Sequence, residues 1–202
     1  MSSPNGVTCA AGNHPSYQRA FLLDRDGVIN YERSDYVKSC AEFAFLPGVL
    51  SALQQLATVG APILIISNQS AIGRGLVSQA AVDALHHQMR QMVIAAGGRI
   101  DGFFLCPHHP EANCDCRKPK PGLLLQAATA FGLALPECTF IGDAVTDWQA
   151  AQAADCQSIL VESGRQGPHL RTLFAGQRMP PIVPNLADAV TRLLSVRQET
   201  YV

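Results

Sequence analysis

Two aspartates separated by one residue, Asp24 and Asp26, are the feature of the sequence that most directly suggests chemistry. Two carboxylates can divide the work of cleaving a phosphate ester. One attacks phosphorus as a nucleophile, and the other protonates the leaving alkoxide and later deprotonates water. Gly27 follows directly and permits a tight turn that can aim both side chains at one point. On its own, the pattern Asp-x-Asp-Gly is equally compatible with a solvated turn after a strand.

Two carboxylates facing a phosphate dianion would repel it, so the site also needs positive charge and hydrogen-bond donors. Three further polar segments offer these groups or ligands for a metal ion. Asp143 and Asp147 add two acids, which together with Asp24 offer hard oxygen ligands for Mg²⁺. Residues 117–121, Arg-Lys-Pro-Lys-Pro, form a cationic loop stiffened by prolines. Residues 67–69, Ser-Asn-Gln, offer a hydroxyl, amides and backbone N–H groups to phosphoryl oxygens. Each segment alone is compatible with an ordinary polar loop, but their combination in this order favours a phosphatase.

A second cluster of reactive side chains has the spacing Cys-x-His followed by Cys-x-Cys, at Cys106, His108, Cys114 and Cys116. Three thiolates and one imidazole satisfy tetrahedral Zn²⁺ and leave no position for water, so the pattern predicts a structural zinc site. The alternative is a coincidental Cys- and His-rich loop. His109 competes for the imidazole position, and the spacing favours His108. Because Cys116 directly precedes the cationic loop, the metal could fix where those cations point.

The elements that must position these residues follow from short apolar runs that alternate with helical patterns. We expect strands at 20–23, 62–66, 139–141 and 158–161, and helices at 48–59, 78–96, 121–131 and 148–154. This alternation predicts a parallel sheet with helices on both faces, whose functional groups gather at the carboxyl ends of the strands. Asp24, Ser67 and Asp143 each come just after an expected strand and should therefore converge.

Composition favours one globular domain over residues 18–202, after a flexible tail at 1–17. Hydrophobic residues make up 48% of the 202 and charged residues 15%, with a net charge of −1, so we expect neither nucleic acid nor membrane as a partner. The polar N-terminus has no signal-peptide pattern. Seven cysteines are an odd number and do not suggest a disulfide framework. We therefore expect a monomeric protein in the reducing cytoplasm.

The order of these motifs resembles the aspartate-nucleophile branch of the haloacid dehalogenase superfamily. The resemblance covers roughly residues 20–164 and implies a Rossmann-like three-layer sandwich with a central parallel sheet. It also implies Asp24 as the nucleophile and Asp26 as the general acid and base. Ser67 and Lys118 would stabilise the transferring phosphoryl group. Magnesium would be held by Asp24, by the backbone carbonyl of Asp26 and by Asp143. Asp147 would be a supporting acid or a ligand through water.

Spacing within the superfamily pattern indicates an enzyme without a cap domain. Ser67 lies 41 positions after Asp26, and Lys118 lies 51 positions after Ser67. Neither gap leaves room for an additional domain once a helix and connecting loops are accommodated. The absence of a cap that excludes water also disfavours a phosphomutase. We therefore expect an open site shaped by loops.

The zinc loop and residues 67–75 and 117–122 resemble the heptose bisphosphate phosphatase branch, with the histidinol-phosphate phosphatases as close relatives and the alternative. The implied substrate is a small phosphorylated sugar, recognised by Arg117. The implied pocket residues are Ser34, Asp35, Tyr36, Val37, Ser67, Asn68, Gln69 and Ser70. Two positions depart from the branch, because Ala144 stands where a lysine is usual and Asp35 stands where a glycine is usual. A rival from another class is a zinc-loop interaction module with a vestigial hydrolase site.

Overall fold

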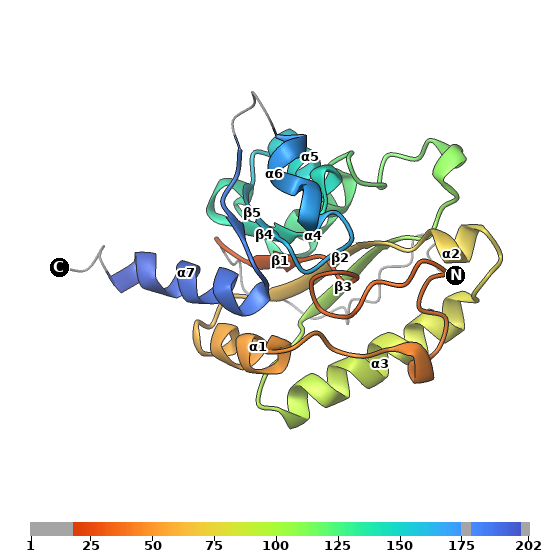
Figure 1. Cartoon of the computed structure of the whole chain (residues 1–202), viewed down its shortest axis with the longest axis horizontal. Helices are drawn as coiled ribbons and strands as arrows, with labels where there is room; N and C mark the ends of the chain where they lie inside the picture. The colour runs from red at the N-terminus through yellow and green to blue at the C-terminus, as the bar shows by residue number, and fades with distance from the viewer. Residues whose placement is uncertain (1–17, 175–178, 199–202) are drawn as a thin grey trace.

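A computed structural model describes residues 18–174 and 179–198 of the chain (Figure 1). The tail expected at 1–17 lies outside the described residues. Six parallel strands in the described part form one sheet in the order β3-β2-β1-β4-β5-β6. They are β1 (Phe21–Leu23), β2 (Ile63–Asn68), β3 (Gly102–Cys106), β4 (Thr139–Gly142), β5 (Gln157–Val161) and β6 (Ile182–Val183).

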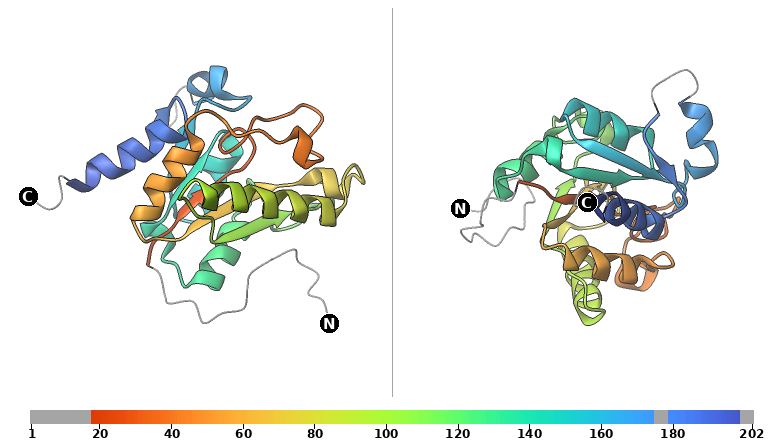
Figure 2. Two further views of the ribbon diagram at one scale, coloured as in Figure 1. Left: turned by 90° about the horizontal axis from the view of Figure 1, so that it is seen from below. Right: turned by 90° about the vertical axis from the view of Figure 1, so that its left-hand side faces the viewer.

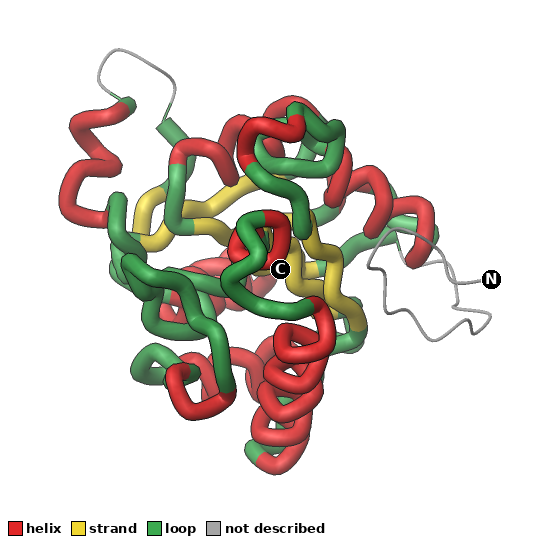
Figure 3. The backbone as a smooth tube through the Cα atoms, turned by 90° about the vertical axis from the view of Figure 1, so that its right-hand side faces the viewer, coloured by secondary structure: helices red, strands yellow, loops and turns green. Residues whose placement is uncertain are grey.

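Helices cover both faces of this sheet, which makes the three-layer architecture that the sequence predicts. One face carries α1 (Val49–Thr58), α3 (Gln79–Ala95) and α7 (Leu186–Gln198). In Figure 1, α1 and α3 lie below the sheet and α7 extends to the left. The other carries α4 (Gly122–Phe131), α5 (Val145–Ala153) and α6 (Leu170–Leu173). The short α2 (Ser70–Gly73) follows β2. Figure 2 gives the same layers from two other directions, and in Figure 3 the strands lie between helices.

Alternation along the buried strands builds a separate core on each face. Leu22, Leu64 and Phe140 pack in the cluster that includes α4 and α5. Phe21 and Ile63 belong instead to the cluster that includes α1, α3 and α7. Successive side chains of a strand point to opposite faces, so a fully buried parallel strand must be apolar at every position. This is why the strand segments appear in the sequence as continuous apolar runs.

The expected strands and helices are confirmed, with differences at their ends and with elements that were not predicted. β3 is missing from the predicted strands because its last residue, Cys106, belongs to the zinc motif, and such motifs are typical of loops. β6 has two residues and gives no periodic signal. The helix expected at 148–154 begins at Val145, because the Asp147 Oδ2 accepts hydrogen bonds from the backbone N–H groups of Asp143 and Ala144, both at 3.0 Å. A motif acid thus starts the helix.

The segments after β1 and β2 contain no additional domain, as the motif spacing predicts. Residues 24–62 hold a short 3₁₀ turn at Cys40–Glu42 and α1, and residues 69–101 hold α2 and α3. In the part of the chain that the structure describes, no helix combines the length and apolarity needed to span a bilayer.

Candidate active site

Asp24 stands at the carboxyl end of the central strand β1. Its backbone N–H donates to the Ile141 carbonyl at 2.9 Å, which continues the pairing of β1 with β4 past the end of the strand. Its Oδ1 accepts a 2.7 Å hydrogen bond from the Arg25 N–H, and its Oδ2 lies 2.9 Å from the Lys118 Nζ. Both carboxylate oxygens are therefore oriented by fixed partners at the edge of the sheet.

Lys118 is a buried cation enclosed by anions and carbonyl groups. Its Nζ lies 2.7 Å from the Asp147 Oδ1 in an ionic contact and donates to the Ile66 carbonyl at 3.2 Å. The Asn68 amide holds its backbone from both sides, accepting from its N–H and donating to its carbonyl, each at 3.1 Å. Burial would lower the pKa of the Lys118 ammonium, but the charges of Asp147 and Asp24 raise it above its usual range. The ammonium is therefore charged at neutral pH.

Asp26 sits beside this centre and is held by three donors. Arg25 donates from Nη2 to both of its oxygens, at 2.9 and 2.8 Å, and Asn30 and Gln69 each donate at 2.9 Å. Burial alone would raise the pKa of Asp26, but the charge of Arg25 and these hydrogen bonds lower it. Gln69 also donates to the Ser67 Oγ at 3.0 Å, so one amide links the acid to the serine.

Three buried acids, Asp24, Asp143 and Asp147, bring ligand oxygens within 4.8 Å of one another. Burial raises the pKa of Asp24 to about 6, with Lys118 opposing the shift and Asp147 adding to it. Burial and repulsion from Asp147 and Asp24 raise the pKa of Asp143 well above its usual range. One lysine thus leaves the cluster with excess negative charge, and this favours a bound cation.

The backbone turn after β1 is shaped by the need to approach this cluster. Gly27 has φ +83°, and a Cβ there would lie 2.5 Å from the Asp143 Oδ2. A Cβ at Gly164 would also collide with Asp143. Both positions therefore require glycine, because any side chain would push the Asp143 carboxylate out of the cluster.

A cavity of about 290 Å³ is lined by residues that the sequence predicts to be catalytic. Its lining includes Asp24, Asp26, Ser67, Lys118 and Asp143 from the predicted catalytic and magnesium sets. Of the residues expected to bind substrate, it includes Ser34, Tyr36, Val37 and Asn68. A larger hollow of about 430 Å³ beside Trp148 and Cys156 is not lined by any of these residues.

The other residues expected to bind substrate lie outside the lining of the cavity. Asp35 is exposed and pairs with Lys38 and Arg33. Gln69 and Ser70 are buried beneath the site. Arg117 is half-buried, and its Nη1 has no hydrogen-bond partner among the described residues.

Five lining residues were not identified from the sequence. They are Glu32, Arg33, Thr146, Arg165 and Gln166. Arg165 and Gln166 follow β5, so their position after a strand end was a usable signal. Glu32 and Arg33 lie in the loop after the Asp24 motif, and no local pattern sets them apart.

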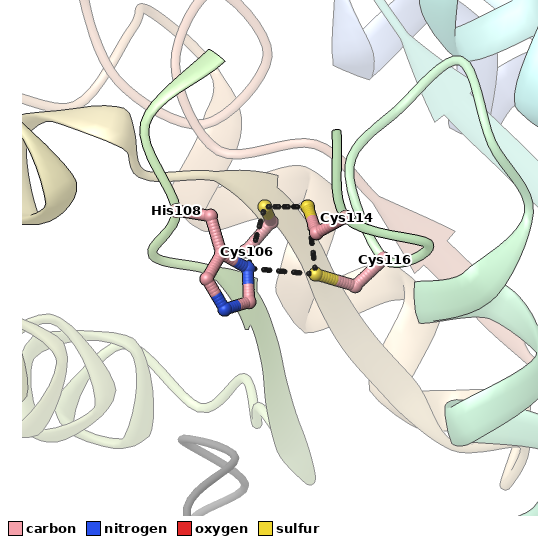
Figure 4. Close-up of side chains that lie close together, drawn as sticks. All are labelled: Cys106, His108, Cys114 and Cys116. Carbon is pink, nitrogen blue, oxygen red and sulfur yellow. Dashed lines mark hydrogen bonds between the residues drawn. The ribbon is translucent and has the colours of Figure 1, made fainter. Parts of the chain in front are cut away.

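The four predicted zinc ligands converge at the end of β3 (Figure 4). The Cys106 Sγ lies 3.5 Å from the Cys114 Sγ, and the Cys114 and Cys116 sulfurs are 3.4 Å apart. The His108 Nδ1 is 3.7 Å from the Cys106 Sγ and 3.2 Å from the Cys116 Sγ. Tetrahedral zinc with bonds of about 2.0–2.3 Å requires ligand edges of roughly 3.3–3.8 Å. Three of the four distances lie within this range and the fourth, from His108 to Cys116, is 0.1 Å shorter, so the cluster suits zinc, and His109 lies outside it.

Comparison with known proteins identifies the family. Residues 115–189 match a family model described as HAD-hydrolase-like. The chain is 39% identical over 176 residues to the D-glycero-beta-D-manno-heptose-1,7-bisphosphate 7-phosphatase of Pseudomonas aeruginosa, covering 86% of this chain and 96% of that one. It is 36% identical over 154 residues to the enzyme of the same name from Escherichia coli K12, covering 72% and 80%. The chain belongs to the haloacid dehalogenase phosphatases.

A solved structure agrees with this family. The D,D-heptose 1,7-bisphosphate phosphatase from B. bronchiseptica, solved with magnesium and phosphate, superposes with a TM-score of 0.82 at 35% identity. The superposition covers 89% of this chain and 99% of that one. The residues of the present chain also suit magnesium. Asp24 and Asp143 offer oxygens, and the Asp26 carbonyl accepts no hydrogen bond from the described residues. Asp147 already contacts Lys118 and accepts a hydrogen bond from the Asp143 N–H at the start of α5.

Asp143→Asn tests whether uncompensated charge is stored in the site of this phosphatase. In magnesium-free buffer without chelator, we expect the variant to raise the free energy of unfolding by about 1 kcal/mol, or about 2–4 °C in Tm. The amide carries no charge to repel Asp24 and Asp147. The gain should shrink as the pH falls, because the Asp143 and Asp24 carboxylates, whose pKa values are both raised, take up protons in the folded protein. Thermal unfolding across pH measures both effects.

The control for this experiment is Asp83→Asn on α3, outside the acid cluster, which should leave Tm unchanged because the amide oxygen can keep the hydrogen bond from Gln79. Added Mg²⁺ should stabilise the parent protein and the control but not Asp143→Asn. A variant that is less stable than the parent without magnesium would contradict the argument.

Cys114→Ser tests the zinc site. We expect loss of bound zinc and a fall of roughly 2–4 kcal/mol in the free energy of unfolding. Turnover should fall as well, because Cys116 precedes Lys118 by two residues and the metal anchors that segment. Elemental analysis, thermal unfolding and phosphate release measure the three effects. Cys40→Ser, outside the cluster, should retain zinc and activity. Full zinc content in Cys114→Ser would overturn the assignment.

Proposed function

We propose that this protein removes the 7-phosphate of D-glycero-D-manno-heptose 1,7-bisphosphate through a phosphorylated Asp24. The observation that carries the proposal is the buried pair of Asp24 and Lys118 at the floor of a cavity with a second cationic region at its rim. The relatives named above support the substrate. Histidinol phosphate or another small phosphate ester is the alternative, and a vestigial interaction module is disfavoured by the intact catalytic set.

In the first step, an Asp24 carboxylate oxygen forms a bond to phosphorus while the bond from phosphorus to the sugar oxygen breaks. Asp26 transfers its proton to the departing alkoxide. In the second step, the Asp26 carboxylate takes a proton from water, whose oxygen attacks phosphorus and releases inorganic phosphate and the Asp24 carboxylate. Magnesium, when bound at Asp24, Asp143 and the Asp26 carbonyl, would neutralise charge on the phosphoryl oxygens.

Lys118 and Ser67 stabilise the phosphoryl group in this proposal. The Lys118 ammonium is already oriented by its contact with Asp24, so little reorganisation is needed during phosphoryl transfer. Ser67 lines the same cavity. Asp26 can donate a proton in the first step only if its carboxyl group is protonated when the substrate is bound. An approaching phosphate dianion raises its proton affinity, because a neighbouring negative charge disfavours the ionised form.

The second phosphate of the substrate is proposed to meet Arg165 at the rim. Glu32 anchors this residue, accepting from its backbone N–H at 3.2 Å and pairing with its Nη2 at 3.0 Å. Its Nε and Nη1 have no partner among the described residues and can grip a phosphate. Arg33, by contrast, already pairs with Asp35. Arg165 thereby supplies a charge near Ala144, where a lysine is usual in the branch. Arg117, whose Nη1 is unpartnered, remains a proposed second ligand.

The proposal extends to the oligomeric state and to the cellular compartment. We propose that the protein acts as a monomer. Among the described residues, Cys40, Cys106, Cys114, Cys116, Cys138 and Cys156 form no disulfide, which suits the reducing cytoplasm.

Asp24→Asn tests the covalent step. The amide has nearly the shape of the carboxylate but is a poor nucleophile, so turnover should fall by roughly 10³-fold or more with Tm little changed. Rapid acid quenching should trap a hydroxylamine-sensitive phosphoprotein from the parent and none from the variant. Turnover of purified Asp24→Asn near the rate of the parent would rule out the mechanism.

Arg165→Ala tests substrate assignment. We expect the parent to prefer heptose 1,7-bisphosphate over heptose 7-phosphate by roughly 10²-fold in kcat/KM, because a grip on the second phosphate persists into the transition state. Arg165→Ala should remove most of that preference while leaving aryl phosphate hydrolysis unchanged. Steady-state kinetics on the three esters measures it.

Arg171→Ala is the matched control for this experiment. Arg171 is as exposed as Arg165, 59% against 60%, and also pairs with a glutamate, but it does not line the cavity. Arg117→Ala, measured beside it, assigns any remaining preference. A parent that hydrolyses histidinol phosphate as efficiently as the bisphosphate would overturn the substrate while leaving the phosphatase chemistry in place.

A further inference from the structure

Arg25, the residue between the two catalytic aspartates, is a buried guanidinium with two different partners. Its side chain is 1% exposed. Its Nε and Nη2 point to Asp26, with the closest contact at 2.8 Å. Its Nη1 points the other way and lies 3.2 Å from the Nε2 of His86, which is 61 positions later in the chain. The guanidinium therefore connects the acid/base carboxylate to α3.

The contact with His86 has one chemically sensible direction. A guanidinium has donors and no acceptor, so the imidazole Nε2 must accept with its lone pair and the ring proton must sit on Nδ1. Burial, and then the positive charge of Arg25, lowers the pKa of His86 to about 3. His86 is therefore a neutral acceptor at every pH at which the enzyme would work.

The imidazole is itself fixed by packing between helix and sheet. His86 is 4% exposed on the buried side of α3, and its ring stacks on Phe103 of β3 with centroids 4.5 Å apart and planes 14° apart. Arg90, one turn later on α3, lies over the same Phe103 ring at 5.0 Å. The Nε2 lone pair of His86 is therefore held in one orientation and is shielded from solvent.

We propose that His86 is a positioning residue for the acid/base step, since it holds the Arg25 guanidinium in the orientation that aims the Asp26 carboxylate at the leaving group. This inference rests on the proposed function of Asp26. Without an acceptor at position 86, the Arg25 Nη1 is buried without a partner. The guanidinium then turns to satisfy that donor and loses its fork on Asp26, so the carboxylate is no longer held in place.

The test uses the leaving group as the readout. An alkoxide needs a proton when it departs, whereas 4-nitrophenolate is a stable anion and needs little help. kcat/KM for the two kinds of ester reports the step that transfers the phosphoryl group to Asp24. We expect His86→Leu to lower kcat/KM for an alkyl phosphate by roughly 10–100-fold, and for 4-nitrophenyl phosphate by less than about 3-fold.

Two further substitutions at position 86 separate the acceptor from the packing. His86→Phe keeps a ring against Phe103 but has no acceptor, so it should show the same selective loss and serves if the leucine variant does not fold. His86→Gln offers an amide oxygen near the place of Nε2 and should recover most of the alkyl phosphate activity. The matched controls are His87→Leu and His87→Gln, because His87 is the next residue of α3 and is exposed. They should match the parent on both substrates.

Asp26→Asn, measured beside these variants, distinguishes failure of the inference from failure of the proposed function. If Asp26→Asn loses equal activity on both substrates, Asp26 is not the acid and the proposed function fails at that residue. If Asp26→Asn is selective for the alkyl phosphate but the Leu and Phe variants at position 86 lose activity on both substrates equally, or on neither, the role of His86 is overturned.

Discussion

The buried ammonium of Lys118 is the interaction on which the rest of the site depends. A cation removed from water is costly unless anions and carbonyl groups replace its hydration, and Asp24, Asp147 and the Ile66 carbonyl do so. The same arrangement places positive charge against Asp24, the proposed nucleophile, before any substrate arrives. A lysine in water would have to reorganise its surroundings during phosphoryl transfer, whereas this one is already oriented. The Asn68 amide and the zinc loop hold the segment that carries it.

Two metals divide the remaining work according to their ligands. Thiolates and imidazole hold zinc in a closed site, where the ion stabilises a loop otherwise poor in regular structure. Carboxylates and a carbonyl suit magnesium, which stays exchangeable and meets the substrate. Asp143 lies in the acid cluster only because Gly27 and Gly164 leave space for its carboxylate. Because Cys116 and Lys118 are only two positions apart in the chain, zinc binding helps to fix the position of Lys118.

The sequence predicted the sheet and the convergence of the motifs because both depend on local patterns. Apolar runs mark the buried strands, and polar motifs mark where those strands end. What it could not predict depends on contacts between distant segments. Nothing near Asp147 indicates that its carboxylate would both start α5 and hold Lys118. Nothing near Arg165 indicates that Glu32, 133 positions earlier, would anchor it at the cavity. The zinc ligands were predictable because all four lie within eleven residues.

In the proposed mechanism, Asp26 must act as an acid in the first step and as a base in the second, and its surroundings explain how one side chain can meet both demands. Donors from Arg25, Asn30 and Gln69 stabilise the carboxylate, which is the form that deprotonates water. The acid form is needed only when a phosphate dianion is bound, and that dianion itself raises the proton affinity of the group. Because the donors come from two segments, the loop after β1 and the end of β2, the carboxylate stays aimed while its charge changes. A rigid guanidinium, held from behind by a neutral imidazole, is suited to this, since its own charge does not change with pH.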